Sequence, residues 1–330
     1  MSVGQDTPPH GSGTPESVDA PEGADTHETV ETLEGTVFDI GYQKYTGPRE
    51  GRRRARIAVY KDGVRNALGL GRGARAKVLT WFFITVLGVI ALVMALIAGA
   101  VQRYVGGQAV EALNLPSHSD YYGIASIVFL VLAAVGAPEL LCPDRRDGVL
   151  NIYFVRPLTA SDYIVARWAA FLSVMSLVAW APQTILWIGL TMGDPNPVDY
   201  FLENWLDVPR FLASGAAIAL YTTTLAMMVS AFTTRRAMAS VFLVGMFLIS
   251  TAWTSGVAAA VGGTLGQWIS MFNLTNIPVH VNDLIFGQVS TVTVGAPAGE
   301  LPSWILVGWY LLWTLVPAVI LWIRYRRLAL

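Results

Sequence analysis

The first apolar stretch of the chain is Leu79–Val101, which reads LTWFFITVLGVIALVMALIAGAV and contains no charged residue. A helix needs about 20 residues to cross the hydrocarbon core of a bilayer, so this segment is long enough to span it. It is too long for the apolar region of a signal peptide, and the first 30 residues lack the basic and apolar runs of such a peptide. We therefore expect a first membrane-spanning helix here.

Five further apolar segments follow and carry almost no charge. The whole chain is 54% hydrophobic and 14% charged, whereas a soluble domain is about 25% charged. The predicted fold class is an all-α integral membrane protein, with six transmembrane helices making up a domain at residues 79–330. The spans are expected at about 79–101, 121–142, 168–191, 211–232, 237–262 and 303–323.

The distribution of basic residues predicts the orientation. If the N-terminus is cytoplasmic, all of the 22 Lys and Arg residues except Arg103 and Arg210 fall on the inner side of the membrane. Cytoplasmic loops of membrane proteins carry this excess of positive charge. We expect a multi-pass protein of the cytoplasmic membrane whose N- and C-termini are both cytoplasmic.

Residues 1–78 differ from the rest of the chain. Residues 1–40 are acidic and rich in Gly, Pro, Ser and Thr, which predicts a disordered acidic cytoplasmic tail. Residues 41–78 are basic, and apolar side chains recur there at helical spacing, at Ile57, Tyr60, Val64 and Leu68. We expect an amphipathic connecting helix at the membrane surface, whose interface residues bind lipid headgroups: Arg53, Arg56, Tyr60, Lys61 and Arg65.

Motifs for catalysis or cofactor binding are missing from the sequence. Cys142 is the single cysteine, and the four histidines show no metal-ligand spacing. Lys77 is preceded by Ala76 and followed by Val78, which excludes a Walker A loop, and no G-x-S-x-G motif occurs. The net charge of −1 and the position of the basic run before a span argue against nucleic acid as a partner. We expect a protein that is not an enzyme and that itself binds no metal or other cofactor.

The predicted spans contain one charged residue, Glu139, which lies near the inner end of the second span. Ion-coupled carriers commonly place a carboxylate or a broken helix near the bilayer midplane. The uncharged midplane therefore argues against an ion-coupled carrier and against a proton channel.

The inner loop at 143–167 is the most informative connection. Charged residues stand at its start, apolar and aromatic residues occupy 149–155, and Arg156-Pro157 then ends the element. Thr159 or Ser161 is expected to cap the helix of the third span. The loop is interpreted either as a helix resting on lipid headgroups or as a docking element for a cytoplasmic partner.

The chain resembles the membrane subunit of an ABC transporter of the ABC-2 type, over about residues 40–330. The resemblance rests on the order of spans, the amphipathic helix before them, the segment Asp144–Leu150, the turn Arg156-Pro157-Leu158, and Tyr163. The stretches 45–49 and 74–79 are also similar to actinobacterial permeases of this group.

The resemblance implies an ABC-2 (type V exporter-like) permease fold and a coupling helix in the loop 143–167. The chain would be the permease subunit of an ATP-driven transporter, most simply an exporter. A separate cytoplasmic ATPase subunit would hold ATP and Mg²⁺, and a second permease copy, identical or related, would complete the pathway. The ATPase-coupling residues implied are Asp144, Arg145, Arg146, Asp147, Gly148, Leu150, Tyr153, Arg156 and Pro157.

Two other functions remain open. One is an ATP-independent membrane anchor or scaffold whose basic N-terminus recruits a cytoplasmic protein, and the other is an intramembrane lipid-modifying enzyme. The outer loop at 263–302 is long for an unstructured connection, so short interfacial or re-entrant helices are expected in it, with a strand-like alternation at 289–294.

Overall fold

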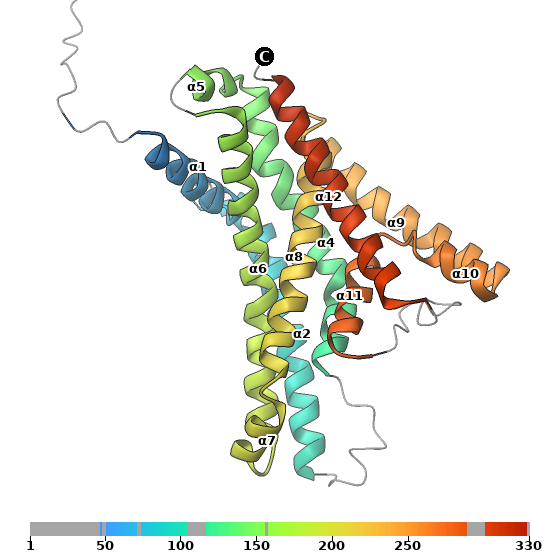
Figure 1. Cartoon of the computed structure of the whole chain (residues 1–330). Helices are drawn as coiled ribbons and strands as arrows, with labels where there is room; N and C mark the ends of the chain where they lie inside the picture. Colours follow the sequence, from blue (N-terminus) through green and yellow to red (C-terminus); the bar gives the residue numbers. More distant parts are fainter. Residues whose placement is uncertain are drawn as a thin grey trace, which may run out of the picture. The chain divides into compact units, whose positions relative to one another are not determined.

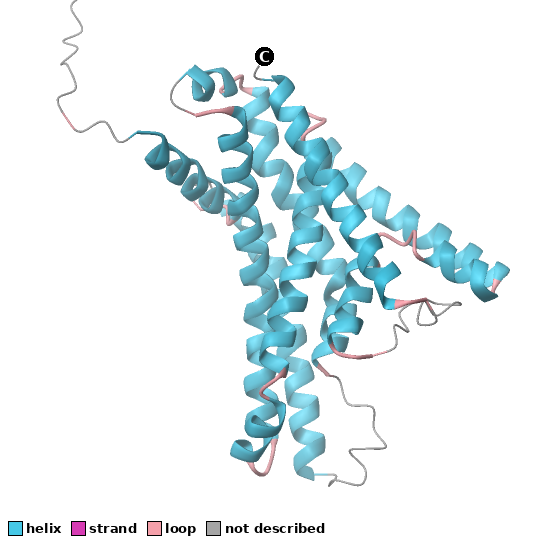
Figure 2. Cartoon of the chain, in the orientation of Figure 1, coloured by secondary structure: helices cyan, strands magenta, loops and turns pink. Residues whose placement is uncertain are grey.

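The structure is a computed structural model that describes residue 47 and residues 51–70, 74–104, 117–155, 158–288 and 301–328. The predicted acidic tail at 1–40 and the alternating segment at 289–294 lie outside this part of the chain. All regular secondary structure in the described residues is helical (Figures 1 and 2). The all-α prediction is therefore confirmed for these residues.

Six of the helices are long and apolar enough to cross a membrane. Each overlaps one of the predicted spans, which confirms a multi-pass membrane protein. They are α2 (Ala74–Tyr104), α4 (His118–Arg146), α6 (Ala160–Gly193), α8 (Asp207–Ser230), α9 (Arg236–Val261) and α12 (Ser303–Leu328).

The helix α6 begins at Ala160, well before the expected start of the third span at Trp168. Thr159 is its N-cap: the Thr159 hydroxyl accepts a hydrogen bond from the backbone N–H of Asp162, and the Asp162 carboxylate accepts one from the backbone N–H of Thr159, both at 3.2 Å. This capping box satisfies two amide groups at the helix start, so the polar residues join the helix. Because α4 also continues to Arg146, the expected loop shrinks to the residues that carry α5 (Leu150–Val155).

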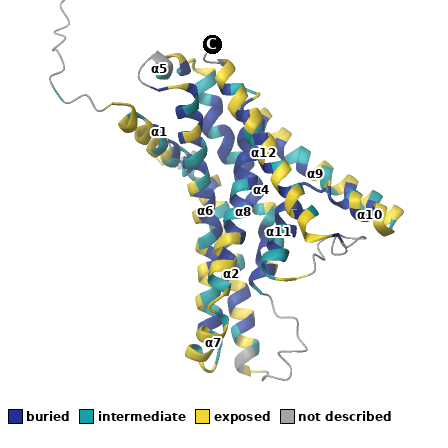
Figure 3. Ribbon diagram, viewed as in Figure 1, coloured by how far each residue is buried: buried dark blue, intermediate teal, exposed yellow. Residues whose placement is uncertain are grey.

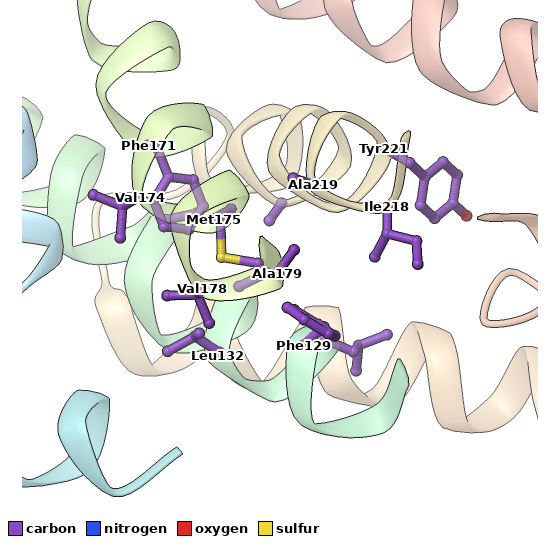
Figure 4. Packing of buried hydrophobic residues seen from close by; sticks show 14 of the residues in the cluster. Phe129, Leu132, Phe171, Val174, Met175, Val178, Ala179, Ile218, Ala219 and Tyr221 are labelled. Carbon is purple, nitrogen blue, oxygen red and sulfur yellow. The ribbon is translucent and has the colours of Figure 1, made fainter. Parts of the chain in front are cut away.

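The three helices α4, α6 and α8 form the centre of the bundle. In the most apolar segment of each of these helices, between 56% and 67% of the segment is buried inside the bundle. The corresponding share is 22% to 28% for α2, α9 and α12. Figure 3 shows the buried residues, in dark blue, concentrated on these central helices, and Figure 4 shows Phe129, Met175 and Ile218 packed between them. The outer helices consequently present long apolar faces to the membrane.

The basic helix α1 (Gly51–Ala67) packs against α6 through Val59, Gly63 and Ala67. Three residues of the expected apolar face, Tyr60, Val64 and Leu68, also pack against the core and are partly buried, whereas Ile57 stays 38% exposed. A Cβ atom at Gly63 would lie 2.7 Å from the Cβ of Ala170 on α6, so glycine allows the close approach of the two helices. Contact with α6 therefore determines which side of α1 is buried.

Three short helices lie in the remaining connections: α7 (Pro197–Asn204), α10 (Gly263–Ser270) and α11 (Ile277–Ile285). The short helices expected between the fifth and sixth spans are present as α10 and α11. Asn282 on α11 donates a hydrogen bond to the Ser119 carbonyl at 3.1 Å and accepts one from Ser214 at 2.6 Å. These buried bonds tie α11 to α4 and α8. Figure 1 shows α5 and the end of α12 at one end of the bundle and α7 at the other, called here the α5 end and the α7 end.

Candidate functional site

A buried arginine joins three helices at the α5 end. Arg167, in the second turn of α6, is 1% exposed, and its guanidinium lies 2.7 Å from the carboxylate of Asp144 on α4 and 2.8 Å from that of Asp62 on α1. The Tyr163 hydroxyl donates a further hydrogen bond to Asp144, at 2.6 Å. A buried cation must be paired to be tolerated, and the flat guanidinium has enough donors for two carboxylates.

A second set of contacts fastens the start of α1 to the start of α6. Arg52 donates a hydrogen bond to Asp162 at 2.5 Å, and the guanidinium of Arg56 lies 3.8 Å from the same carboxylate. The bond to Asp162 raises the pKa of Arg52 above its ordinary value. One turn further along, the Tyr60 hydroxyl donates to Ser173 on α6 at 2.9 Å. The helix α1 is thus attached to α6 by polar contacts along the part that precedes Gly63.

A row of tyrosine rings connects α5 to two long helices. The ring of Tyr153 on α5 lies 5.6 Å from that of Tyr163 on α6, which lies 5.7 Å from that of Tyr325 on α12. Arg167 also stands over the Tyr163 ring, at 5.6 Å from its centre. Burial raises the pKa of the Tyr153 phenol. Aromatic pairs at these distances stabilise packing beyond the area they bury, so α5 is held against the bundle.

The turn before α5 depends on a glycine. Gly148 has a φ of +67°, in the left-handed region that other residues rarely adopt. Asp147, at the end of α4, pairs with Arg146 at 2.8 Å, and this hydrogen bond lowers the pKa of the Asp147 carboxyl. Leu150 faces inward, whereas Ile152 is 73% exposed. The α5 segment therefore presents an apolar side chain outward from the end of the bundle.

The neighbouring turn between α8 and α9 is held by two further arginines. Arg145 donates hydrogen bonds to the backbone carbonyls of Ala231 and Thr233. Arg236 binds both carboxylate oxygens of Glu139, at 2.7 and 2.9 Å. The single ionisable residue expected inside the spans thus belongs to an ion pair near the α5 end.

The structure brings together some of the predicted coupling residues. Asp144 binds Arg167, and the ring of Tyr153 packs against Tyr163 beside it. Arg145 instead binds the α8–α9 turn. Gly148 and Leu150 position α5, and the exposed Arg146 and Asp147 pair with each other. Arg156 and Pro157 lie outside the described residues.

The predicted membrane-interface residues divide into two groups. Arg53, Lys61 and Arg65 are exposed on α1, as lipid contact requires. Arg56 and Tyr60 instead make polar contacts with α6. The side chains at the α1 surface are therefore shared between the helix bundle and the surroundings.

Sequence reasoning missed four residues of the ion pairs that join α1, α4 and α6. They are Arg52, Asp62, Asp162 and Arg167. Two signals were present: Asp62 is an acidic residue within a basic helix, and Arg167 stands directly before an apolar run. A charge at such a boundary is satisfied by water or by a partner, and the sequence does not distinguish the two.

The charged groups of Arg52, Asp62, Asp144, Asp162 and Arg167 are paired with one another. Such pairing holds α1, α4 and α6 together. No group of three side chains suited to holding a metal ion occurs within the part of the chain that the structure describes. No protein-family model matches the chain, and no curated protein shows significant similarity to it.

Proposed function

We propose that the chain is the permease subunit of an ATP-driven ABC transporter of the ABC-2 type, an exporter powered by a separate ATPase subunit. One observation carries the proposal. The segment that bears α5 runs from α4 to α6, and Arg167 on α6 pairs with Asp144 on α4 and also with Asp62 on α1. In this proposal the α5 end is cytoplasmic, ATP and Mg²⁺ bind to the ATPase, and a second permease copy completes the pathway.

The cluster provides a route for force. A displacement of α5 pulls on Asp144 through the turn at Gly148, and on α6 through the contact between Tyr153 and Tyr163. Because the buried guanidinium of Arg167 binds carboxylates on both α4 and α1, the three helices are proposed to move as a unit rather than separately. A permease needs such a unit to convert closure of an ATPase into movement of its membrane helices.

The outward face of α5 is the proposed point of contact with the ATPase. Ile152 is a large apolar side chain exposed there, and the ion pair between Arg146 and Asp147 precedes it in the chain. Apolar anchors surrounded by polar groups are typical of protein interfaces. The sequence carries no recognised nucleotide-binding motif, so the proposal places ATP hydrolysis on a separate subunit.

Purification of the full-length chain from its native membranes in mild detergent tests the proposal. We expect a chain with a Walker A motif to co-purify in stoichiometric amount, together with vanadate-sensitive hydrolysis of MgATP. Ile152→Glu should remove most of this ATPase, because a charge replaces an apolar anchor at the interface.

Thr234→Glu is the matched control. It adds the same charge at an exposed position in the α8–α9 turn, at the same end of the bundle but outside α5. This variant should retain the ATPase. If the wild-type chain co-purifies only with a protein that lacks a Walker motif, the chain is an ATP-independent anchor and the proposal is wrong.

A further inference from the structure

The outer helix α9 borders a deep apolar groove that the proposed coupling route does not use. Its part nearer the α5 end has a volume of about 700 Å³ and lies between the end of α8 and the first turns of α9. A second hollow of about 450 Å³ continues it along α9 toward Trp253 and Trp313. Phe242 and Met246 line both hollows, so the two form one elongated groove.

The lining is suited to a flexible hydrocarbon chain. In the larger hollow, Thr233 is the one polar side chain, and three of the lining residues are methionines: Met228, Met238 and Met246. Methionine side chains are unbranched and adapt to irregular ligands. Both volumes fall within the range of about 300 to 1,000 Å³ that is typical of ligand sites.

The end of the groove at the α8–α9 turn is positively charged. The Arg324 guanidinium, from α12, stands 5.4 Å from the centre of the Phe232 ring, which lines the groove. The Nε atom of Arg324 is buried and has no hydrogen-bond partner among the described residues. The turn itself contributes Arg235 and Arg236 and is held by Arg145, and Glu139 pairs with Arg236. A buried donor without a partner among the described residues is costly, so an anionic acceptor bound at this end of the groove would be stabilised.

We propose that this groove binds one anionic phospholipid from the leaflet at the α5 end. One acyl chain would lie along α9 past Phe242 and Met246, and the phosphate would accept hydrogen bonds from Arg324 beside the α8–α9 turn. An arginine suits this role because its guanidinium matches the geometry of a phosphate group. The site is independent of the proposed ATPase contact, which lies on α5.

A second copy of the chain is the competing occupant of this face. Parallel copies related by a two-fold axis along the membrane normal would bring identical residues to the same height in the bilayer. The arginines around both α8–α9 turns would then face each other, and like charges across an interface are unfavourable. The charge at the end of the groove therefore favours a lipid over a second copy.

Native mass spectrometry of the delipidated full-length chain tests the proposal, with added dioleoyl phosphatidylglycerol or dioleoyl phosphatidylcholine as the probe. We expect the wild-type chain to retain one phosphatidylglycerol in preference to phosphatidylcholine. Arg324→Gln should weaken that preference about fivefold, the effect of one basic residue on an anionic headgroup. Arg324→Lys should keep most of it. Arg326→Gln is the matched control, because Arg326 lies over Trp322 instead, at 4.7 Å.

A groove-filling variant tests the apolar part separately. A Cβ atom at Gly245, which lines the groove, meets nothing within 4 Å, so Gly245→Leu should fill the space without disturbing the helix and should reduce retention of both lipids. Gly256→Leu on the same helix is equally unobstructed but lies outside the groove, and it should behave as the wild type. Equal retention of the two lipids by the wild type, or retention unchanged in Gly245→Leu, would overturn the proposal. So would disulfide cross-linking between two copies through Val241→Cys.

Discussion

The Arg167 guanidinium lies 2.7 Å from the Asp144 carboxylate, and this contact joins α6 to the end of α4 across the segment that carries α5. The side chain of Asp144 is 16% exposed and that of Arg167 is 1% exposed, so water screens the pair only weakly. The second partner of Arg167, Asp62, is 52% exposed. Loss of the buried Arg167 should therefore cost far more stability than loss of the exposed Asp62.

Replacing Arg167 by Met should be strongly destabilising, because Asp144 would remain mostly buried without its cation. Breaking a buried pair in this way costs about 3 to 5 kcal/mol. Asp62→Asn should cost no more than about 1 kcal/mol, since exposed pairs are screened by water. Unfolding in mixed micelles with increasing denaturing detergent measures both values, and equal effects of the two variants would contradict this assignment.

Gly63→Ala should loosen α1 from α6, because the new methyl group would lie 2.7 Å from the Cβ of Ala170. Trypsin should then cut faster at Arg53, Lys61 and Arg65, which are exposed on α1 but protected while the segment remains a packed helix. Ala170→Gly removes the obstructing Cβ, so the double variant should regain the wild-type cleavage rate. If Gly63→Ala alone is cut at the wild-type rate, the close approach of the helices is not needed to hold α1.

Glu139 and Arg236 should show a coupling energy in a double-mutant cycle. Their side chains are 27% and 38% exposed, so we expect about 1 kcal/mol rather than the larger value of a fully buried pair. Glu139→Gln and Arg236→Gln should each destabilise the chain, and the combination should be milder than the sum. Strict additivity in the same micelle unfolding measurement would show that the two side chains do not interact.

Gly148→Val should displace α5, because a β-branched residue is strained at a φ of +67°. Gly148→Asn should be milder, since asparagine tolerates the left-handed region better than other residues. The measurement is the amount of ATPase that co-purifies with each variant: we expect a severe loss for Val and a smaller one for Asn. A Cβ atom at Gly148 meets nothing within 4 Å, so steric crowding does not explain a loss. Equal recovery from both variants would show that the conformation of this turn does not matter for binding.

The number of membrane spans was predictable, because the length and apolarity of a segment are local properties of the chain. The residues at which each span begins and ends were less predictable. The start of α6 at Ala160 depends on the capping box of Thr159 and Asp162, which brings charged residues into the first turns of a membrane helix. Hydropathy alone excludes those residues from the span, because it does not register that Asp162 pairs with Arg52 and that Arg167 is paired with carboxylates on α1 and α4.

The cluster at the α5 end was predictable only in part. Blocks of charged and apolar residues within the loop at 143–167 predict a functional element there. Of the expected apolar face of α1, Tyr60, Val64 and Leu68 pack against the core. The fully buried positions are their neighbours Val59, Gly63 and Ala67, because the glycine allows α1 to approach Ala170 closely. A glycine on a predicted helix gave no sign of which neighbour it would meet.

The sequence by itself determined that the chain is a helical, multi-pass membrane protein with six segments long and apolar enough to span a bilayer, since the hydrocarbon core requires such helices. It also determined that α1 is basic and that the chain lacks recognisable catalytic motifs. Only the tertiary structure decided that Arg167 is buried among Asp62, Asp144 and Tyr163, and that Arg324 lies at the end of an apolar groove. Ion pairs and grooves depend on which distant segments become neighbours, and that follows from the packing of whole helices rather than from any one stretch of chain.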